Sequence, residues 1–227
     1  MHSRKIIEKV KEDYNRIAAG FSISRTCDWP EFDEFLRFYK KDFTILDMGC
    51  GNGRLVNYLE KIGFTKYIGI DQSKELLKFA KESVGTRRGV LFLEADISNL
   101  SDSFLKANAG KFGAIFAIAS FHHLPPPLQE QTLRDWHKLL RPGGYLFMMN
   151  WNLFQWRFWK QWLRAIFWPR YGFFGLQIPW KGDPKKVVNR YYYAFTARRL
   201  RQLCSSTGFS VELCKKTSNI VIVARRK

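Results

Sequence analysis

Cysteine and long apolar runs are scarce in this sequence, and each scarcity argues against a class of protein. The four cysteines have no Cys-x-x-Cys spacing and no histidine at metal-ligand spacing, which argues against a zinc site, an iron–sulfur cluster or a disulfide framework. No run of about 18 apolar residues is present, so no transmembrane helix is expected. The amino-terminal residues are charged and lack the apolar core of an export signal. These observations predict a cytoplasmic protein that binds no metal.

Acidic residues are the next shortage, above all in the last third of the chain. The 227 residues include 38 Lys and Arg against 20 Asp and Glu, which gives a formal net charge of +18. Residues 151–227 hold 16 of the basic residues, six of the eight tryptophans and only two acidic residues, Asp183 and Glu212. Such an excess predicts an anionic partner, either a nucleic acid or an anionic membrane surface.

Short apolar stretches of strand type alternate with helical stretches along most of the chain. Strands are predicted at residues 43–48, 67–70, 90–94, 112–119 and 145–150. Helices are predicted at residues 4–19, 31–39, 54–61, 74–83, 128–140 and 196–205, and a closing hairpin at 209–214 and 220–224. This alternation predicts an α/β domain with parallel βαβ units, whose ligand lies at the carboxyl ends of the strands.

A glycine-rich turn follows the first predicted strand, in the order Asp-Met-Gly-Cys-Gly-Asn-Gly from Asp47 to Gly53. Glycine is needed where the backbone approaches a ligand closely, although such a turn alone fits a plain tight turn equally well. Asp71 ends the second predicted strand, where a carboxylate can accept two hydrogen bonds from a ribose diol. Asp96 and Ile97 close the third strand, where a carboxylate can bind an adenine amine. The three features in this order predict a nucleoside pocket.

The turn has the spacing Gly-x-Gly-x-Gly with an aspartate two residues ahead. This pattern resembles the first motif of the class I S-adenosylmethionine-dependent methyltransferases, over residues 43–150. The resemblance implies a Rossmann-like α/β fold with a seven-stranded, mostly parallel sheet and helices on both faces. It also implies S-adenosylmethionine as cofactor. The cofactor-binding residues expected are Arg25, Asp47, Gly49, Cys50, Gly51, Asn52, Asp71, Gln72, Ser73, Asp96, Ile97 and Ala119.

Three further segments resemble the tRNA methyltransferases that esterify the carboxymethyl group of a wobble uridine. The segments run from Tyr14 to Arg25 with Trp29-Pro30 after them, over the pair His122-His123, and from Arg190 to Phe195. The sequence departs from that family at Ser24, Gln72 and Tyr193. The resemblance implies tRNA as partner and, as in some members, a small activator protein. The residues expected to face the methyl acceptor are His122, His123, Trp151, Arg190 and Tyr191.

The residues themselves favour the same chemistry. A carboxylate is already ionised at pH 7, so its methylation needs positioning cations such as Arg25 and Arg190 rather than a base. His122 and His123 are expected to hydrogen-bond the substrate or to act as a general base. The aromatic side chains of Trp151, Tyr191 and Tyr192 offer surfaces for stacking a base, although core packing accounts for any single one of them better. The loop after the fourth strand lacks the Asp/Asn-Pro-Pro-Tyr/Phe motif of enzymes that methylate exocyclic amines.

The aromatic and basic stretch at residues 155–170 leaves three interpretations open. It is a lid helix over the active site, an RNA contact, or a helix that lies on a membrane surface. The last interpretation accompanies an alternative function, a small-molecule methyltransferase that acts on a lipid or quinone-like acceptor. A third hypothesis, an RNA-binding module without activity, conflicts with the intact cofactor motif.

We expect one domain over residues 1–227, in four parts. They are amino-terminal helices in 1–40, a cofactor-binding core in 43–150, an aromatic and basic insertion in 151–190, and a helix and hairpin in 191–227.

Overall fold

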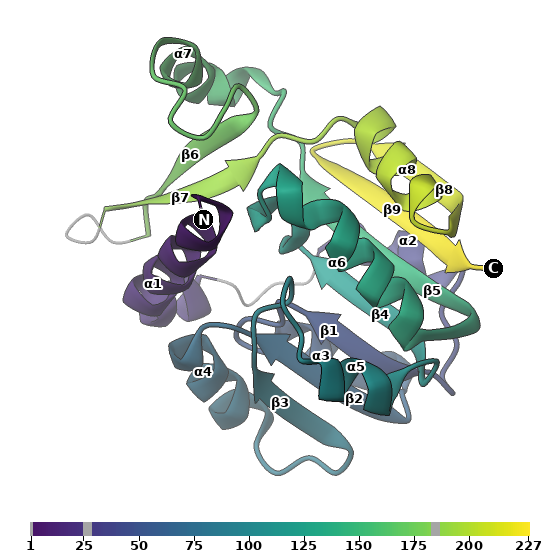
Figure 1. The fold of residues 1–227 in the computed structure, drawn as a ribbon. Coiled ribbons are helices and arrows are strands. Elements are labelled where there is room, and N and C mark those ends of the chain that lie inside the picture. Colours follow the sequence, from purple (N-terminus) through teal and green to yellow (C-terminus); the bar gives the residue numbers. More distant parts are fainter. Residues whose placement is uncertain (1, 25–28, 183–186) are drawn as a thin grey trace.

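A seven-stranded sheet forms the centre of the computed structural model, which describes residues 2–24, 29–182 and 187–227 (Figure 1). The strand order is β3-β2-β1-β4-β5-β9-β8, and only the β9 pairings, with β5 and β8, are antiparallel. The strands are β1 Thr44–Met48, β2 Lys66–Asp71, β3 Val90–Glu94, β4 Phe112–Ile118, β5 Leu140–Trp151, β8 Phe209–Lys216 and β9 Asn219–Arg226. The predicted seven-stranded, mostly parallel sheet is confirmed.

Helices cover both faces of this sheet. One face carries α5, α6 and α8 at Asp102–Asn108, Pro126–Leu139 and Ala197–Ser206, and the other carries α2, α3 and α4 at Phe32–Leu36, Arg54–Ile62 and Lys74–Val84. β4 is buried along its whole length, because both of its faces pack under helices. The sequence pattern missed α5, which has no buried residue and therefore no clear apolar stripe.

The insertion after β5 forms a lobe of its own, which lies away from the main sheet in Figure 1. It contains a short 3-10 helix η2 at Trp156–Phe158, α7 at Trp159–Phe167 and a two-stranded antiparallel sheet of β6 (Gly175–Trp180) and β7 (Val188–Tyr193). β7 crosses the expected boundary at residue 190, so the insertion extends to Tyr193. Neither β6 nor β7 is among the strands predicted from the sequence.

The first helix, α1 at His2–Ile23, packs between α4 and β7 (Figure 1). Its Ile17 is buried against Trp180 and Val188 of the small sheet. Gly20 allows close contact here, because a Cβ on this residue would lie 2.6 Å from Cη2 of the Trp180 ring. α1 therefore joins the main sheet to the insertion.

Among the described residues, no helix is long and apolar enough to cross a membrane. The same residues contain no cluster of histidine, cysteine and carboxylate side chains suited to a metal ion.

Replacing Gly20 by alanine tests how tightly α1 packs on the insertion. Alanine ordinarily stabilises a helix relative to glycine, but here its methyl group must displace the Trp180 ring. We expect Gly20→Ala to lower the free energy of unfolding by about 1–3 kcal/mol in urea titrations. In a Trp180→Leu background the same change should be neutral or stabilising, and an equal loss in both backgrounds would contradict the contact.

Candidate active site

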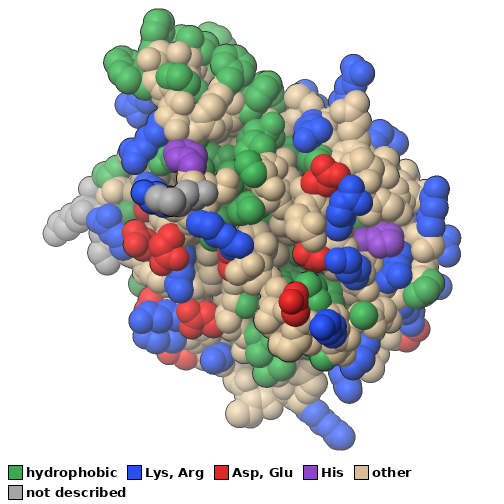
Figure 2. All heavy atoms as spheres, in the orientation of Figure 1, with side chains coloured by type: hydrophobic (Ala, Val, Ile, Leu, Met, Phe, Trp, Pro, Cys, Tyr) green, Lys and Arg blue, Asp and Glu red, His purple; other side chains and the backbone are tan. Residues whose placement is uncertain are grey.

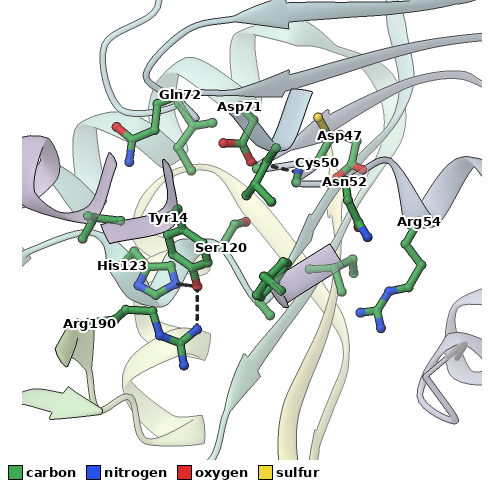
Figure 3. Close-up of a pocket in the computed structure, with 18 of the residues that line it drawn as sticks. Tyr14, Asp47, Cys50, Asn52, Arg54, Asp71, Gln72, Ser120, His123 and Arg190 are labelled. Carbon is green, nitrogen blue, oxygen red and sulfur yellow. Dashed lines mark hydrogen bonds between the residues drawn. The ribbon is translucent and has the colours of Figure 1, made fainter. Parts of the chain in front are cut away.

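A cavity lies outside the carboxyl ends of β1, β2, β3 and β4, where the strand order reverses between β1 and β4 (Figure 3). α1 and β7 close its remaining sides, and their Tyr14 and Arg190 point into it. Most residues predicted from the sequence line this cavity: Asp47, Gly49, Cys50, Gly51, Asn52, Asp71, Gln72, Asp96, Ile97, Ala119, His123, Trp151 and Arg190. Arg25 lies outside the described residues.

The glycine-rich turn brings bare backbone to the cavity. Gly49 has a φ of +84° and Gly51 a φ of +56°, which are backbone angles that residues other than glycine rarely adopt. A Cβ on Gly49 would lie 2.4 Å from the Ser120 Cβ, whereas nothing lies within 4 Å of a Cβ on Gly51 except Phe21 at 4.0 Å. The backbone at Gly51 therefore faces open space. Burial raises the pKa of the neighbouring Cys50 thiol, so this cysteine stays neutral.

Asp71, at the carboxyl end of β2, is held by two backbone groups. The Gly51 N–H donates to Oδ2 and the Ser73 N–H donates to Oδ1, each at 2.8 Å. Each oxygen keeps lone pairs free for a diol. Ser73 itself has a different task from the one predicted. Its hydroxyl caps α4 by accepting the Leu76 N–H and donates to Asn15 of α1, so its side chain lies outside the cavity.

Two further carboxylates line the cofactor side of the cavity. Asp96 accepts the backbone N–H and the hydroxyl of Ser98 at 2.8 Å, and its second oxygen accepts from Arg4 at 3.1 Å. Asp47 is buried and accepts the Tyr67 hydroxyl. Burial raises the pKa of the Asp47 carboxyl to about 7, so this group titrates near neutral pH.

The opposite side of the cavity contains a chain of hydrogen bonds (Figure 3). The Tyr191 carbonyl only accepts, so the His123 Nδ1 donates to it, at 2.7 Å. The His123 Nε2 therefore accepts, from the Tyr14 hydroxyl at 2.9 Å. That hydroxyl in turn accepts from an Arg190 Nη at 3.1 Å. Three segments meet in this chain: α1, the 3-10 helix η1 at Phe121–His123, and β7.

The prediction that His123 acts as a general base is wrong for this geometry. Both ring nitrogens are occupied, and burial lowers the pKa of His123 to about 3. A neutral imidazole with no free lone pair takes no proton from a substrate at pH 7. His123 is a positioning residue, which holds the Tyr14 hydroxyl.

Two residues predicted to face the acceptor have side chains outside the cavity. Strand residues alternate between faces, so Arg190 and Tyr192 of β7 point into the cavity while Tyr191 points away, into a cluster with Ile6 and Val10 of α1. His122 is buried, and its Nδ1 accepts the Trp151 backbone N–H at 3.2 Å. Burial lowers the pKa of His122 well below its usual value, so it is neutral.

Arg190 is the charged group at the acceptor side. Its side chain is 2% exposed, and its Nε has no hydrogen-bond partner among the described residues. No described carboxylate forms a salt bridge with it. The nearby Asp13 interacts electrostatically with Arg190 but is paired with Lys9, at 2.6 Å. The guanidinium lies beside aromatic rings, 5.3 Å from the Tyr192 centroid and 6.0 Å from that of Trp151. Arg190 is therefore a buried cation that can bind an anion.

Several cavity residues are not among the predicted cofactor or acceptor residues, although Tyr192 is a predicted stacking surface. Tyr14 begins the segment from Tyr14 to Arg25 that resembles the tRNA methyltransferases. No local pattern shows that it lies beside Arg190. Tyr192 stacks on Trp151, with ring centroids 5.1 Å apart. Trp29 lies under the Arg54 guanidinium, 3.3 Å from the ring centroid, and both residues line the cavity.

Comparison with known proteins identifies the core of the chain. Residues 45–144 match the family described as "Methyltransferase domain". Residues 45–144 are therefore similar to a methyltransferase domain. The fold of the chain is that of S-adenosylmethionine-dependent methyltransferases: a structure from Methanosarcina mazei with that description superposes with a TM-score of 0.71 at 20% identity, covering 88% of this chain and 98% of the other. That structure is described as S-adenosylmethionine-dependent, and this is the cofactor predicted from the sequence.

Two relatives are named for different acceptors. A tRNA (carboxymethyluridine(34)-5-O)-methyltransferase of Xenopus tropicalis is 32% identical over 150 residues, which is 65% of this chain and 22% of that protein. A ubiquinone biosynthesis O-methyltransferase of Vibrio parahaemolyticus is 29% identical over 109 residues, covering 48% of this chain and 43% of the other. The chain spans between 20% and 33% of the length of the first four relatives that it matches.

A further structural neighbour is a Haloferax volcanii methyltransferase in complex with the Trm112 methyltransferase activator. It superposes with a TM-score of 0.67 at 14% identity and covers 95% of this chain and 96% of the other.

The residues of the cavity fit S-adenosylmethionine. Asp71 has acceptor lone pairs for a ribose, and the open backbone at Gly51 leaves room beside it. Ala119 adds a strained backbone, since its φ of +55° makes it the one described non-glycine residue with a positive φ. When bound, the cofactor supplies an activated methyl group. The individual contacts of Asp47, Asp96 and Ile97 with the cofactor stay predictions.

The raised pKa of Asp47 predicts how cofactor binding by the methyltransferase domain depends on pH. S-adenosylmethionine is cationic, so it favours the ionised carboxylate that exists above pH about 7. We expect its affinity, measured by calorimetry, to fall about tenfold between about pH 8 and about pH 6. Asp47→Asn should bind more weakly and lose this pH dependence. An unchanged pH profile in the variant would assign the titration to another group.

Proposed function

We propose that this protein transfers a methyl group from S-adenosylmethionine to the carboxylate of a carboxymethyl group on a wobble uridine of tRNA, and so forms a methyl ester. The observation that carries the proposal is Arg190, a buried guanidinium at the acceptor side of the cavity, whose Nε has no hydrogen-bond partner and which forms no salt bridge among the described residues. A guanidinium binds a carboxylate through two parallel hydrogen bonds, so a substrate carboxylate supplies the missing partner.

The protonation states at the acceptor side support a carboxylate over an amine or a hydroxyl. His123 is the one histidine among the described residues that lines the cavity, and it is neutral with both nitrogens occupied. An ionised carboxylate has no proton to lose and needs no base. Methyl transfer to it requires only that its oxygen be held in line with the methyl group, which is a task of positioning.

The aromatic rings beside Arg190 support a nucleobase as the carrier of that carboxylate. Trp151 and Tyr192 lie one against the other at the cavity, and each lies near the guanidinium. Rings in this position offer a stacking surface for a base, which contributes on the order of 1–3 kcal/mol.

The formal net charge of +18 suits an RNA partner, and four relatives carry the name of this tRNA activity. A cytoplasmic location, where such tRNA is modified, stays a prediction. A Trm112-type activator is proposed as a second partner, because a structural neighbour was solved in complex with one.

A second candidate function is methyl transfer to a quinone-like or lipid acceptor. The relative named for ubiquinone biosynthesis favours it. The neutral, fully bonded His123 does not, because methylation of a phenolic hydroxyl is assisted by a base.

The function is tested by supplying methyl-labelled S-adenosylmethionine with tRNA or with a lipid extract, with and without a Trm112-type activator. The tRNA is first treated with mild alkali, which hydrolyses existing methyl esters to free carboxylates. We expect label in tRNA that mild alkali releases as methanol. Asp71→Ala, which lacks the ribose carboxylate, serves as the inactive control. Alkali-stable label in tRNA, label only in lipid, or no label in any arm would each overturn the proposal.

Arg190 and Tyr14 should control the acceptor without affecting the cofactor. A charged hydrogen bond is worth about 1.5–3 kcal/mol, so we expect Arg190→Gln to lower kcat/KM for tRNA by about tenfold to a hundredfold. Tyr14→Phe removes the hydroxyl that orients Arg190, and its loss should be smaller. Binding of S-adenosylmethionine should stay unchanged in both variants. If the variants lost cofactor affinity as much as kcat/KM, these residues would be structural. Arg198→Gln, on the exposed side of α8, is the matched control and should leave both quantities unchanged.

A further inference from the structure

The helix α7 presents two apolar faces, and only one of them is used inside the molecule. On the inward face Ala165 is buried, and the Trp162 indole N–H donates to the Leu153 carbonyl at 2.8 Å. These side chains pack with Leu176 and Ile178 of β6. The inward face therefore accounts for how α7 is attached to the small sheet.

The second face of α7 and its flanking residues point into solvent. We call this the outward face, and it consists of Trp156, Trp159, Leu163, Ile166, Phe167 and Trp168. Trp156 is 84% exposed, Trp168 75% and Phe167 68%. Figure 2 shows hydrophobic side chains gathered over α7 at the tip of the lobe. Ordinary protein surfaces expose apolar residues singly and scattered. A contiguous apolar surface of this kind therefore marks an interaction site.

Of the three interpretations of this stretch, a lid helix over the active site does not fit the described structure. The cavity lining includes no described residue of α7, and the residues of the insertion that reach the cavity are Trp151, Arg190 and Tyr192. The outward face is thus free of any contact with the active site.

The charge around the outward face is of one sign. Arg157, Lys160, Arg164 and Arg170 are all exposed, and residues 151–182 contain no aspartate or glutamate. Three of these cations alternate with the outward apolar residues along α7 and η2. An amphipathic helix with tryptophan on its apolar face and cations beside it is typical of a helix that lies on an anionic membrane surface.

The apolar residues decide between lipid and RNA. Tryptophan serves either partner, since it stacks on bases and also lies at the membrane interface. Leu163 and Ile166 have no planar surface for a base, but they are the side chains that enter the boundary of a bilayer. Their exposure beside Phe167 favours lipid.

We propose that the outward face of α7 docks this protein on an anionic lipid surface. The cations contact lipid headgroups while the aromatic and aliphatic side chains enter the interface. This docking is separate from the methylation reaction, because it uses no residue of the cavity. Since β6 and β7 connect the lobe to Arg190, docking would also place the acceptor side of the cavity near the membrane.

The proposal is tested by co-sedimentation of the full chain with vesicles in the absence of S-adenosylmethionine and tRNA. We expect the protein to sediment with phosphatidylcholine vesicles that contain about 30% phosphatidylglycerol, and far less with phosphatidylcholine alone. The triple variant Trp156→Ser, Phe167→Ser, Trp168→Ser should partition at least about tenfold more weakly. Lys160→Gln with Arg164→Gln should weaken binding mainly at low salt. Arg198→Gln with Arg201→Gln removes as much charge from exposed positions of α8 and should retain binding.

Binding of S-adenosylmethionine by the triple variant shows that the variant is folded, since its substitutions lie outside the cavity. The proposal is overturned by absent vesicle binding, by equal binding to neutral and anionic vesicles, or by full binding of the triple variant. It is also overturned if the triple variant loses tRNA binding while the wild type never sediments, which would make α7 an RNA contact. Dimers of the wild type that become monomers in the triple variant, without vesicle binding, would assign the outward face to a second copy of the chain.

Discussion

The hydrogen bonds from Arg190 through the Tyr14 hydroxyl to His123 hold together the acceptor side of this protein. The hydroxyl bonds both neighbours only when it accepts from the guanidinium and donates to the imidazole. This requires a neutral His123, which burial provides, and a fixed ring, which the Tyr191 carbonyl provides. A cationic His123 would turn its acceptor nitrogen into a donor and place a second positive charge beside Arg190. The arrangement of Arg190, Tyr14 and His123 therefore depends on His123 carrying a proton on Nδ1 and none on Nε2.

The two sides of the cavity have opposite electrostatic character. Asp47, Asp71 and Asp96 lie on the side where the cationic cofactor is predicted to bind, and the buried Arg190 lies on the other. This separation matches a reaction between a positively charged donor and a negatively charged acceptor. Under the proposed function the acceptor is anionic and needs no base, which agrees with the neutral His123 whose two ring nitrogens are both bonded.

The insertion connects two surfaces that differ in chemistry. The inner residues of β7 complete the cavity, whereas α7 presents apolar and cationic side chains to solvent. Both surfaces belong to one lobe, whose small sheet α1 fixes to the core through the contact of Gly20 with Trp180. The packing of α1 thus positions Tyr14 in the cavity and holds the whole lobe.

The main sheet, the glycine-rich turn and the carboxylates at the strand ends can be predicted from the residues alone, because they follow from local periodicity and from residues that directly end a strand. The sequence did not determine that His123 is a bonded, neutral positioning residue, that Tyr191 points away from the cavity, or that Tyr14 belongs to the site. Those outcomes rest on contacts between residues far apart in the chain, 109 positions for Tyr14 and His123 and 176 for Tyr14 and Arg190. Only the tertiary structure decides such contacts, because the register of β7 and the docking of α1 set which side chains meet and which are buried from water.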